Sequence, residues 1–201
     1  MFLYLIHAIT RRTMNMKKTD QKILCEQIKQ KLMKPIVLLG MMGSGKTHLG
    51  KMLSEALGVQ FYDSDHVIEA RAGIDIPTIF ELYGEQRFRQ SEEKILLELL
   101  SSKPCVIATG GGAPVNPVIL SAIKEKSISV WLDCSVDDIY ERIKKSSHRP
   151  LLKTPNPKEK LQELLSARKD VYAKADKHLR IYGQNADKAL IEMIDALHYM
   201  L

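Results

Sequence analysis

The sequence predicts an α/β fold, a parallel sheet covered by helices on both faces, for two reasons. From residue 35 onward, short apolar segments alternate with longer amphipathic ones, without an internal repeat or a low-complexity linker. Strands and helices that alternate along the chain are typical of parallel sheets. In addition, the glycine-rich motif Gly40-Met-Met-Gly-Ser-Gly-Lys-Thr47 joins the first apolar segment to the first amphipathic one, as in nucleotide-binding members of this class.

Each expected strand is a short apolar run, and each expected helix has apolar residues at helical spacing. The strands are expected at 36–39, 59–62, 104–108, 128–132 and 178–182. The helices are expected at 46–57, 65–72, 77–83, 85–101, 117–125, 136–145, 157–174 and 185–199. Residues 146–157 hold three prolines, through which a helix cannot run, so this segment is a candidate mobile lid between two helices.

Length and charge divide the chain of 201 residues into two parts. Residues 1–34 carry eight Lys/Arg and two Asp/Glu, which accounts for the whole net charge of +6. We therefore expect a basic N-terminal extension and a single domain over 35–201, with no basic excess suited to nucleic acid. Within the extension, Ile23, Leu24, Ile28 and Leu32 predict a short amphipathic helix over 20–33, loosely attached.

The cysteines and the hydropathy favour a cytoplasmic protein. Cys25, Cys105 and Cys134 have no metal-binding spacing, and the last two lie in or beside apolar strands, so we expect buried thiols in a reducing compartment. No segment reaches the roughly 18 apolar residues of a membrane span, so no membrane partner is expected. No long apolar stripe is left outside the core, which favours a monomer.

The motif at 40–47 predicts a nucleoside triphosphate site. Gly43, Ser44 and Gly45 let backbone N–H groups converge on phosphate oxygens, and the helix that follows adds a favourable dipole. Lys46 can reach the β- and γ-phosphates, and the hydroxyl of Thr47 can bind Mg²⁺.

Polar residues after two further strands point to the same edge of the sheet, where ligands bind in this class. Asp63 and Asp65 can divide two roles, one in the water shell of Mg²⁺ and the other toward a substrate hydroxyl. The alternative is that Asp65 only caps the next helix. The run Gly110–Gly112 follows the third strand and suggests a close backbone approach to a ligand, or else a plain turn.

Arg89, Arg149 and Arg168 have no obvious carboxylate partner beside them in the sequence. A guanidinium group suits a substrate carboxylate or a transferring phosphoryl group, although a solvated salt bridge is the ordinary role of any one arginine.

These features together resemble the shikimate kinase family over about residues 35–200. The resemblance rests on six stretches in the family's order, namely GMMGSGKT, FYDSD, GEQRFRQSE, ATGGG, RPLL and RKDVY. It implies a three-layer P-loop fold with a five-stranded sheet in the order 2-3-1-4-5. It also implies transfer of the ATP γ-phosphoryl group to the 3-hydroxyl of shikimate, a step of aromatic amino acid biosynthesis.

The resemblance also implies a role for each matching residue. Catalysis would fall to Lys46, Asp65 and Arg149, the last of these on the lid. Mg²⁺ would lie near Thr47 and Asp63, and ATP against residues 43–48 and Arg149. Shikimate would contact Asp65, Arg89, Gly110, Gly111, Gly112 and Arg168, with the two arginines clamping its carboxylate. Position 48 is a departure, because His48 stands where many members have Ser or Thr. The residue that stacks on adenine stays open between Arg142 and Lys144, with Asn185 opposite.

Two other functions remain open on the sequence alone. A gluconate-kinase-like enzyme would share the phosphate loop and a carboxylated substrate, although the Asp-x-Asp, triple-glycine and RPLL set favours shikimate. A regulatory ATP-binding module without catalysis is opposed by the presence of Lys46, Asp65 and Arg149.

Overall fold

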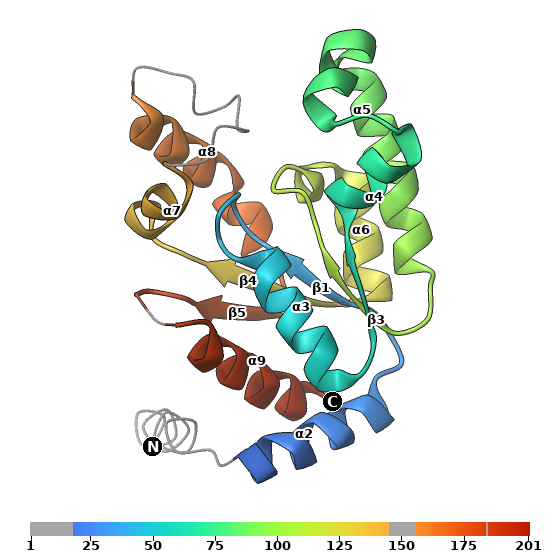
Figure 1. The fold of residues 1–201 in the computed structure, drawn as a ribbon, viewed down its shortest axis with the longest axis vertical. Helices are drawn as coiled ribbons and strands as arrows, with labels where there is room; N and C mark the ends of the chain where they lie inside the picture. The colour runs from blue at the N-terminus through green and yellow to red at the C-terminus, as the bar shows by residue number, and fades with distance from the viewer. Residues whose placement is uncertain (1–17, 145–155, 184) are drawn as a thin grey trace.

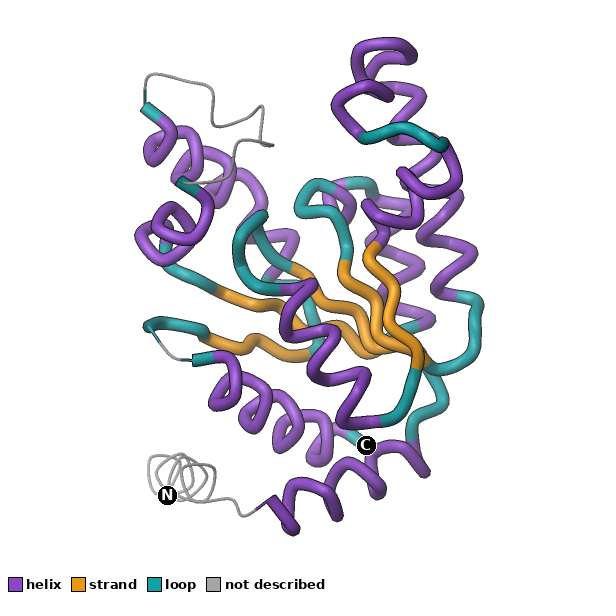
Figure 2. The backbone as a smooth tube through the Cα atoms, viewed as in Figure 1, coloured by secondary structure: helices purple, strands orange, loops and turns teal. Residues whose placement is uncertain are grey.

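The structure, a computed structural model, describes residues 18–144, 156–183 and 185–201. A parallel five-stranded sheet forms its centre (Figure 2). Its strand order is β2-β3-β1-β4-β5. The predicted fold class and strand order are therefore confirmed. Each predicted strand is present, with its ends displaced by no more than two residues. The strands are β1 (Ile36–Leu39), β2 (Gln60–Asp63), β3 (Cys105–Ala108), β4 (Ile128–Asp133) and β5 (Lys177–Arg180).

Helices cover both faces of the sheet (Figure 1). Because connections between parallel strands are right-handed, α3 lies on one face with α9, while α5, α6 and α8 lie on the other. The described helices are α2 (Lys18–Lys31), α3 (Lys46–Leu57), α4 (Ser64–Ala72), α5 (Ile76–Leu100), the short 3₁₀ helix η1 (Ala113–Val115), α6 (Pro117–Lys126), α7 (Val136–Ile143), α8 (Pro157–Tyr172) and α9 (Ala186–Met200).

The predicted helices at 77–83 and 85–101 join into α5 with a break at Gly84. That residue has φ 76° and ψ 170°, a conformation that side chains other than hydrogen disfavour. The two predicted segments are therefore confirmed, and the glycine between them marks the break. Beyond it, the second half of α5 carries Arg89, whose guanidinium group lies beside Gly112, after β3.

The N-terminal helix α2 is an integral part of the core, so the expectation of a loosely attached helix is wrong. Cys25, Ile28 and Leu32 are buried against α9 and α3, and Ile28 has no exposed surface. Ile23, by contrast, is exposed, because the buried face of the helix runs through position 25.

The strands β1 and β3 are apolar, and all four residues of each are buried. The buried thiols predicted for Cys105 and Cys134 are confirmed, and Cys25 is buried too. Across the described ranges, no helix is both long and apolar enough to pass through a bilayer. The polar motifs 40–47, 63–65 and 110–112 follow the carboxyl ends of β1, β2 and β3 and therefore lie at one edge of the sheet.

Candidate active site

The loop between β1 and α3 wraps around the end of a lysine side chain. Gly40, Gly43 and Gly45 have φ angles of 140°, 76° and 97°, which turn the backbone inward. The buried Lys46 donates from Nζ to the carbonyl oxygens of Gly40 and Met41, both at 2.8 Å. The ammonium group therefore lies inside the loop, at the position from which it can bind phosphate oxygens.

Next to this loop, the Thr47 hydroxyl donates to Asp63 Oδ2 at 2.6 Å. Asp63 ends β2 and also caps α4, because its Oδ1 accepts from the backbone N–H of Asp65 at 3.1 Å. The alternative interpretation of Asp65 as the helix cap is therefore wrong. The structure leaves the side chain of Asp65 available for another role.

The Asp65 carboxyl group has an unusual environment. Burial, together with the nearby carboxylates of Asp63 and Glu92, raises its pKa to about 6, although Lys46 opposes the shift. Within the described residues, two buried side-chain oxygens have no hydrogen-bond partner, Asp65 Oδ1 and Ser44 Oγ. An unpartnered buried oxygen is costly, so each of these two atoms requires an explanation.

The three glycines after β3 lie directly against the other predicted site residues. A β-carbon at Gly110 would be 2.8 Å from Asp65 Oδ1, and one at Gly112 would be 3.1 Å from Arg89 Nη1. At Gly111 it would be 3.6 Å from Arg168 Nη1. We call Gly110–Gly112 the glycine strip. Because it lacks side chains, Asp65, Arg89 and Arg168 can approach its backbone closely and lie around one surface.

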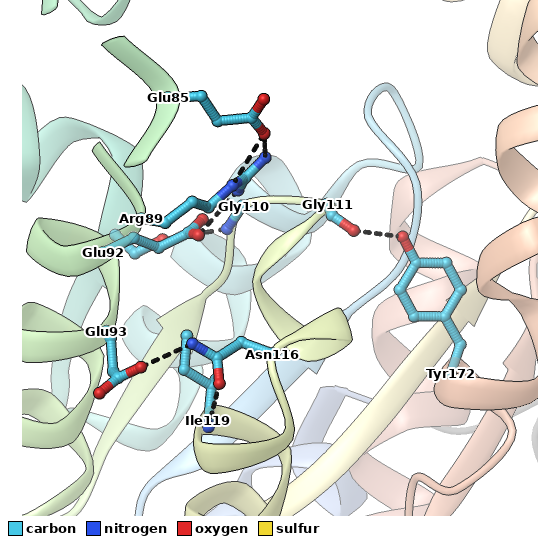
Figure 3. Close-up of polar contacts among 10 residues, drawn as sticks. Glu85, Arg89, Glu92, Glu93, Gly110, Gly111, Asn116, Ile119 and Tyr172 are labelled. Atoms are coloured by element: carbon cyan, nitrogen blue, oxygen red, sulfur yellow. Dashed lines mark hydrogen bonds and ion pairs between the residues drawn. The ribbon is translucent and has the colours of Figure 1, made fainter. Parts of the chain in front are cut away.

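Arg89 and Arg168 converge on this strip from helices on either side of it. Contrary to the expectation from sequence, Arg89 has carboxylate partners on its own helix (Figure 3). Its Nη1 donates to Glu92 Oε2 at 2.8 Å, while Nε and Nη2 donate to Glu85 Oε1 at 3.3 and 3.1 Å. Burial raises the pKa of Glu92, and the two arginines partly offset that rise.

Two hydroxyl groups that the sequence did not single out fix the glycine strip. The buried Ser64 accepts from Gly110 N–H at 3.0 Å, and Tyr172 donates to the Gly111 carbonyl at 2.5 Å (Figure 3). Glu92, only 2% exposed, is a third residue that sequence reasoning missed. Spacing held a signal for two of them, because Glu92 follows Arg89 by three positions and Tyr172 follows Arg168 by four, each on one helix face.

The remaining predicted site residues are placed as follows. His48 lies exposed on the first turn of α3, and Arg142 reaches the phosphate loop, with Nη1 3.3 Å from the Gly43 carbonyl. Asn185 caps α9 through its side chain. Arg149 and most of the predicted lid lie outside the described residues.

The fold and this edge of the sheet define the class of P-loop phosphotransferases. The glycine-rich loop, the hydrogen-bonded pair Thr47–Asp63, a carboxylate with a raised pKa and two convergent arginines lie at one edge of the sheet. Comparison with known proteins agrees with this class and narrows it.

The family model described as shikimate kinase matches residues 42–198. A curated shikimate kinase of Rhizobium meliloti is 41% identical over 173 residues, which cover 85% of this chain and 89% of that protein. The solved shikimate kinase from Acinetobacter baumannii in complex with shikimate superposes with a TM-score of 0.77 at 39% identity. This match covers 83% of this chain and 94% of that one. The chain belongs to the shikimate kinase family.

A gluconokinase from Sinorhizobium meliloti is also similar in structure. It has a TM-score of 0.58 at 19% identity, and the match covers 84% of this chain and 94% of that chain. This likeness extends to the fold alone. The sequence matches the shikimate kinase family along most of its length, so this family is favoured over a gluconate-kinase-like enzyme.

Proposed function

We propose that this chain phosphorylates the 3-hydroxyl of shikimate with ATP held on loop 40–47 and the shikimate carboxylate held between Arg89 and Arg168. As a member of its family, the chain is an ATP-dependent shikimate kinase in aromatic biosynthesis. One observation carries the arrangement. The glycine strip lies against Asp65 at one end and against both arginines along the rest, so a small carboxylated ring can reach all three.

The donor set near Thr47 fits a magnesium ion. The Thr47 hydroxyl and the Asp63 carboxylate lie 2.6 Å apart, and oxygen atoms of these kinds are the ligands that Mg²⁺ prefers. Thr47 would bind the ion directly, and Asp63 would order its water shell. Bound with ATP, Mg²⁺ would neutralise charge on the phosphates.

Asp65 is the group suited to receive the proton of the reacting hydroxyl. With a pKa of about 6 it is ionised at neutral pH, yet more basic than an ordinary aspartate, and its Oδ1 is unpartnered among the described residues. As the shikimate oxygen attacks the γ-phosphorus, its proton passes to Asp65. The bond between the γ-phosphorus and the oxygen that joins it to the β-phosphate breaks, and ADP leaves. Lys46 stabilises the charge that develops on the phosphates. Arg149, the predicted lid arginine, would stabilise the same charge.

The first experiment measures ADP release from Mg-ATP with shikimate or with gluconate as acceptor. A rate that depends on shikimate and exceeds the gluconate rate by orders of magnitude supports the proposal. Binding of ATP without any response to shikimate contradicts it. The variant Lys46→Met is the control for ADP released at any other site, because it removes phosphate stabilisation and should abolish most turnover while the fold persists.

The carboxylate clamp has its own prediction. Arg168→Ala removes a charged hydrogen-bonding group from the acceptor and should raise the KM for shikimate about 10- to 100-fold. The KM for ATP should change less than threefold. Lys169→Ala, which removes an exposed cation from the next position of α8, is the matched control. Equal changes in both KM values for Arg168→Ala would contradict the clamp.

A further inference from the structure

Tyr172 is a buried tyrosine whose hydroxyl bonds to the acceptor site. It has no exposed surface, and its ring lies 5.9 Å from the ring of Trp131 in β4. Its hydroxyl donates to the Gly111 carbonyl at 2.5 Å and lies 3.6 Å from Met41 Sδ in the phosphate loop. One side chain thus contacts both halves of the site.

Helix α8 carries this tyrosine one turn beyond a clamp arginine. A β-carbon at Gly111 would meet Arg168 Nη1 at 3.6 Å, and Arg168 Nη1 also lies 4.0 Å from Met41 Sδ. The hydroxyl bond to Gly111 therefore fixes the distance between α8 and the glycine strip beside the guanidinium group. Burial raises the pKa of Tyr172, so the hydroxyl stays protonated and remains a donor at any working pH.

We infer that Tyr172 is a positioning residue for the acceptor: through the Gly111 carbonyl, its hydroxyl holds the glycine strip at the spacing from Arg168 that the substrate carboxylate requires. The inference rests on the proposed carboxylate clamp. The hydroxyl makes a contribution that packing alone does not, because phenylalanine would fill the same space but leave Gly111 without its donor. Ser64 binds the strip at Gly110, so among the described side chains Tyr172 supplies the hydrogen bond at Gly111.

The test compares Tyr172→Phe with a core variant of similar stability. Loss of one buried hydrogen bond should raise the KM for shikimate about 3- to 10-fold, while the KM for ATP changes less than twofold. Ile194→Val is the control, because Ile194 is fully buried in α9 on the opposite face of the sheet. It should lower the melting temperature by a similar amount and leave both KM values unchanged.

Three outcomes are distinguishable. A selective rise in the shikimate KM for Tyr172→Phe, absent in Ile194→Val, supports the positioning role. Unchanged shikimate KM for Tyr172→Phe, with Arg168→Ala still raising it, overturns the positioning role and leaves the clamp intact. Unchanged shikimate KM in both Tyr172→Phe and Arg168→Ala overturns the clamp and, with it, the inference.

Discussion

Arg89 already forms ion pairs with two carboxylates of its own helix, Glu85 and Glu92. Glu92 is buried and bonds Nη1, whereas Glu85 is mostly exposed and bonds Nε and Nη2. The Nε–Nη2 edge of a guanidinium group is one that a carboxylate can take with two bonds. Glu85 therefore occupies an edge of Arg89 that the acceptor could use, and the acceptor would displace it.

Replacing this competitor should strengthen acceptor binding. Exposed ion pairs one helical turn apart contribute only a few tenths of a kcal/mol, so Glu85→Gln should lower the KM for shikimate about twofold. Glu81→Gln, the same charge change at an exposed position four residues earlier on α5, controls for long-range electrostatics. A higher KM in Glu85→Gln than in Glu81→Gln would mean that Glu85 orients Arg89 rather than competing for it.

Asp65 should make the folded protein less stable as the pH rises. An ordinary aspartate carboxyl has a pKa of 3.8, whereas the pKa of Asp65 in the folded protein is about 6. Between these values the folded state binds more protons than the unfolded state, so the contribution of Asp65 to the free energy of unfolding falls with rising pH. A shift of about two pKa units corresponds to roughly 3 kcal/mol, fully expressed above pH 7.

Asp65→Asn should therefore be more stable and less active than the parent. In a metal-free buffer with a chelator at pH 7.5, we expect its free energy of unfolding to exceed the parent's by about 1–3 kcal/mol. The difference should shrink toward pH 4, where the parent carboxyl is protonated as well. Denaturant unfolding across this pH range measures it, and a difference independent of pH would contradict the raised pKa.

At the scale of residues, the phosphate loop and the glycine strip were predictable from sequence. The residues that hold them in place were not. Lys46 and Thr47 belong to a loop whose residue types follow from phosphate geometry, and the glycine strip follows from the need for open backbone. Ser64, Glu92 and Tyr172 act by fixing those groups. Helical spacing from Arg89 and Arg168 gives a weak signal for Glu92 and Tyr172, but residues of these types are common on helices, so the folded distances are needed to identify all three.

At the scale of elements, glycine and proline residues made several helix boundaries predictable. Gly84 separates the halves of α5, and Pro117 and Pro157 open α6 and α8. Packing of α2 was not predictable, because a short amphipathic helix has the same pattern whether or not a partner covers it. Here α9 and α3 supply the partner, and Ile28 becomes fully buried against them.

At the scale of the whole molecule, the alternation of strands and helices predicts layers, while the right-handed connection limits how they can be ordered. The strand order itself came from the family resemblance rather than from periodicity. Charge is distributed unevenly over this architecture, since the basic excess belongs to residues 1–34. Helix α2 nevertheless ties part of that basic segment to the core.

A boundary drawn at residue 34 should therefore cut through the folded unit. Removing α2 uncovers the core beneath Cys25, Ile28 and Leu32, and truncating even one fully buried isoleucine typically costs about 2–4 kcal/mol. Typical domains have only about 5–15 kcal/mol of stability. Residues 35–201 should melt at least about 10 °C lower than residues 18–201, or should fail to fold. Equal melting temperatures for the two shortened chains would mean that α2 adds no stability and that residues 35–201 form a complete domain.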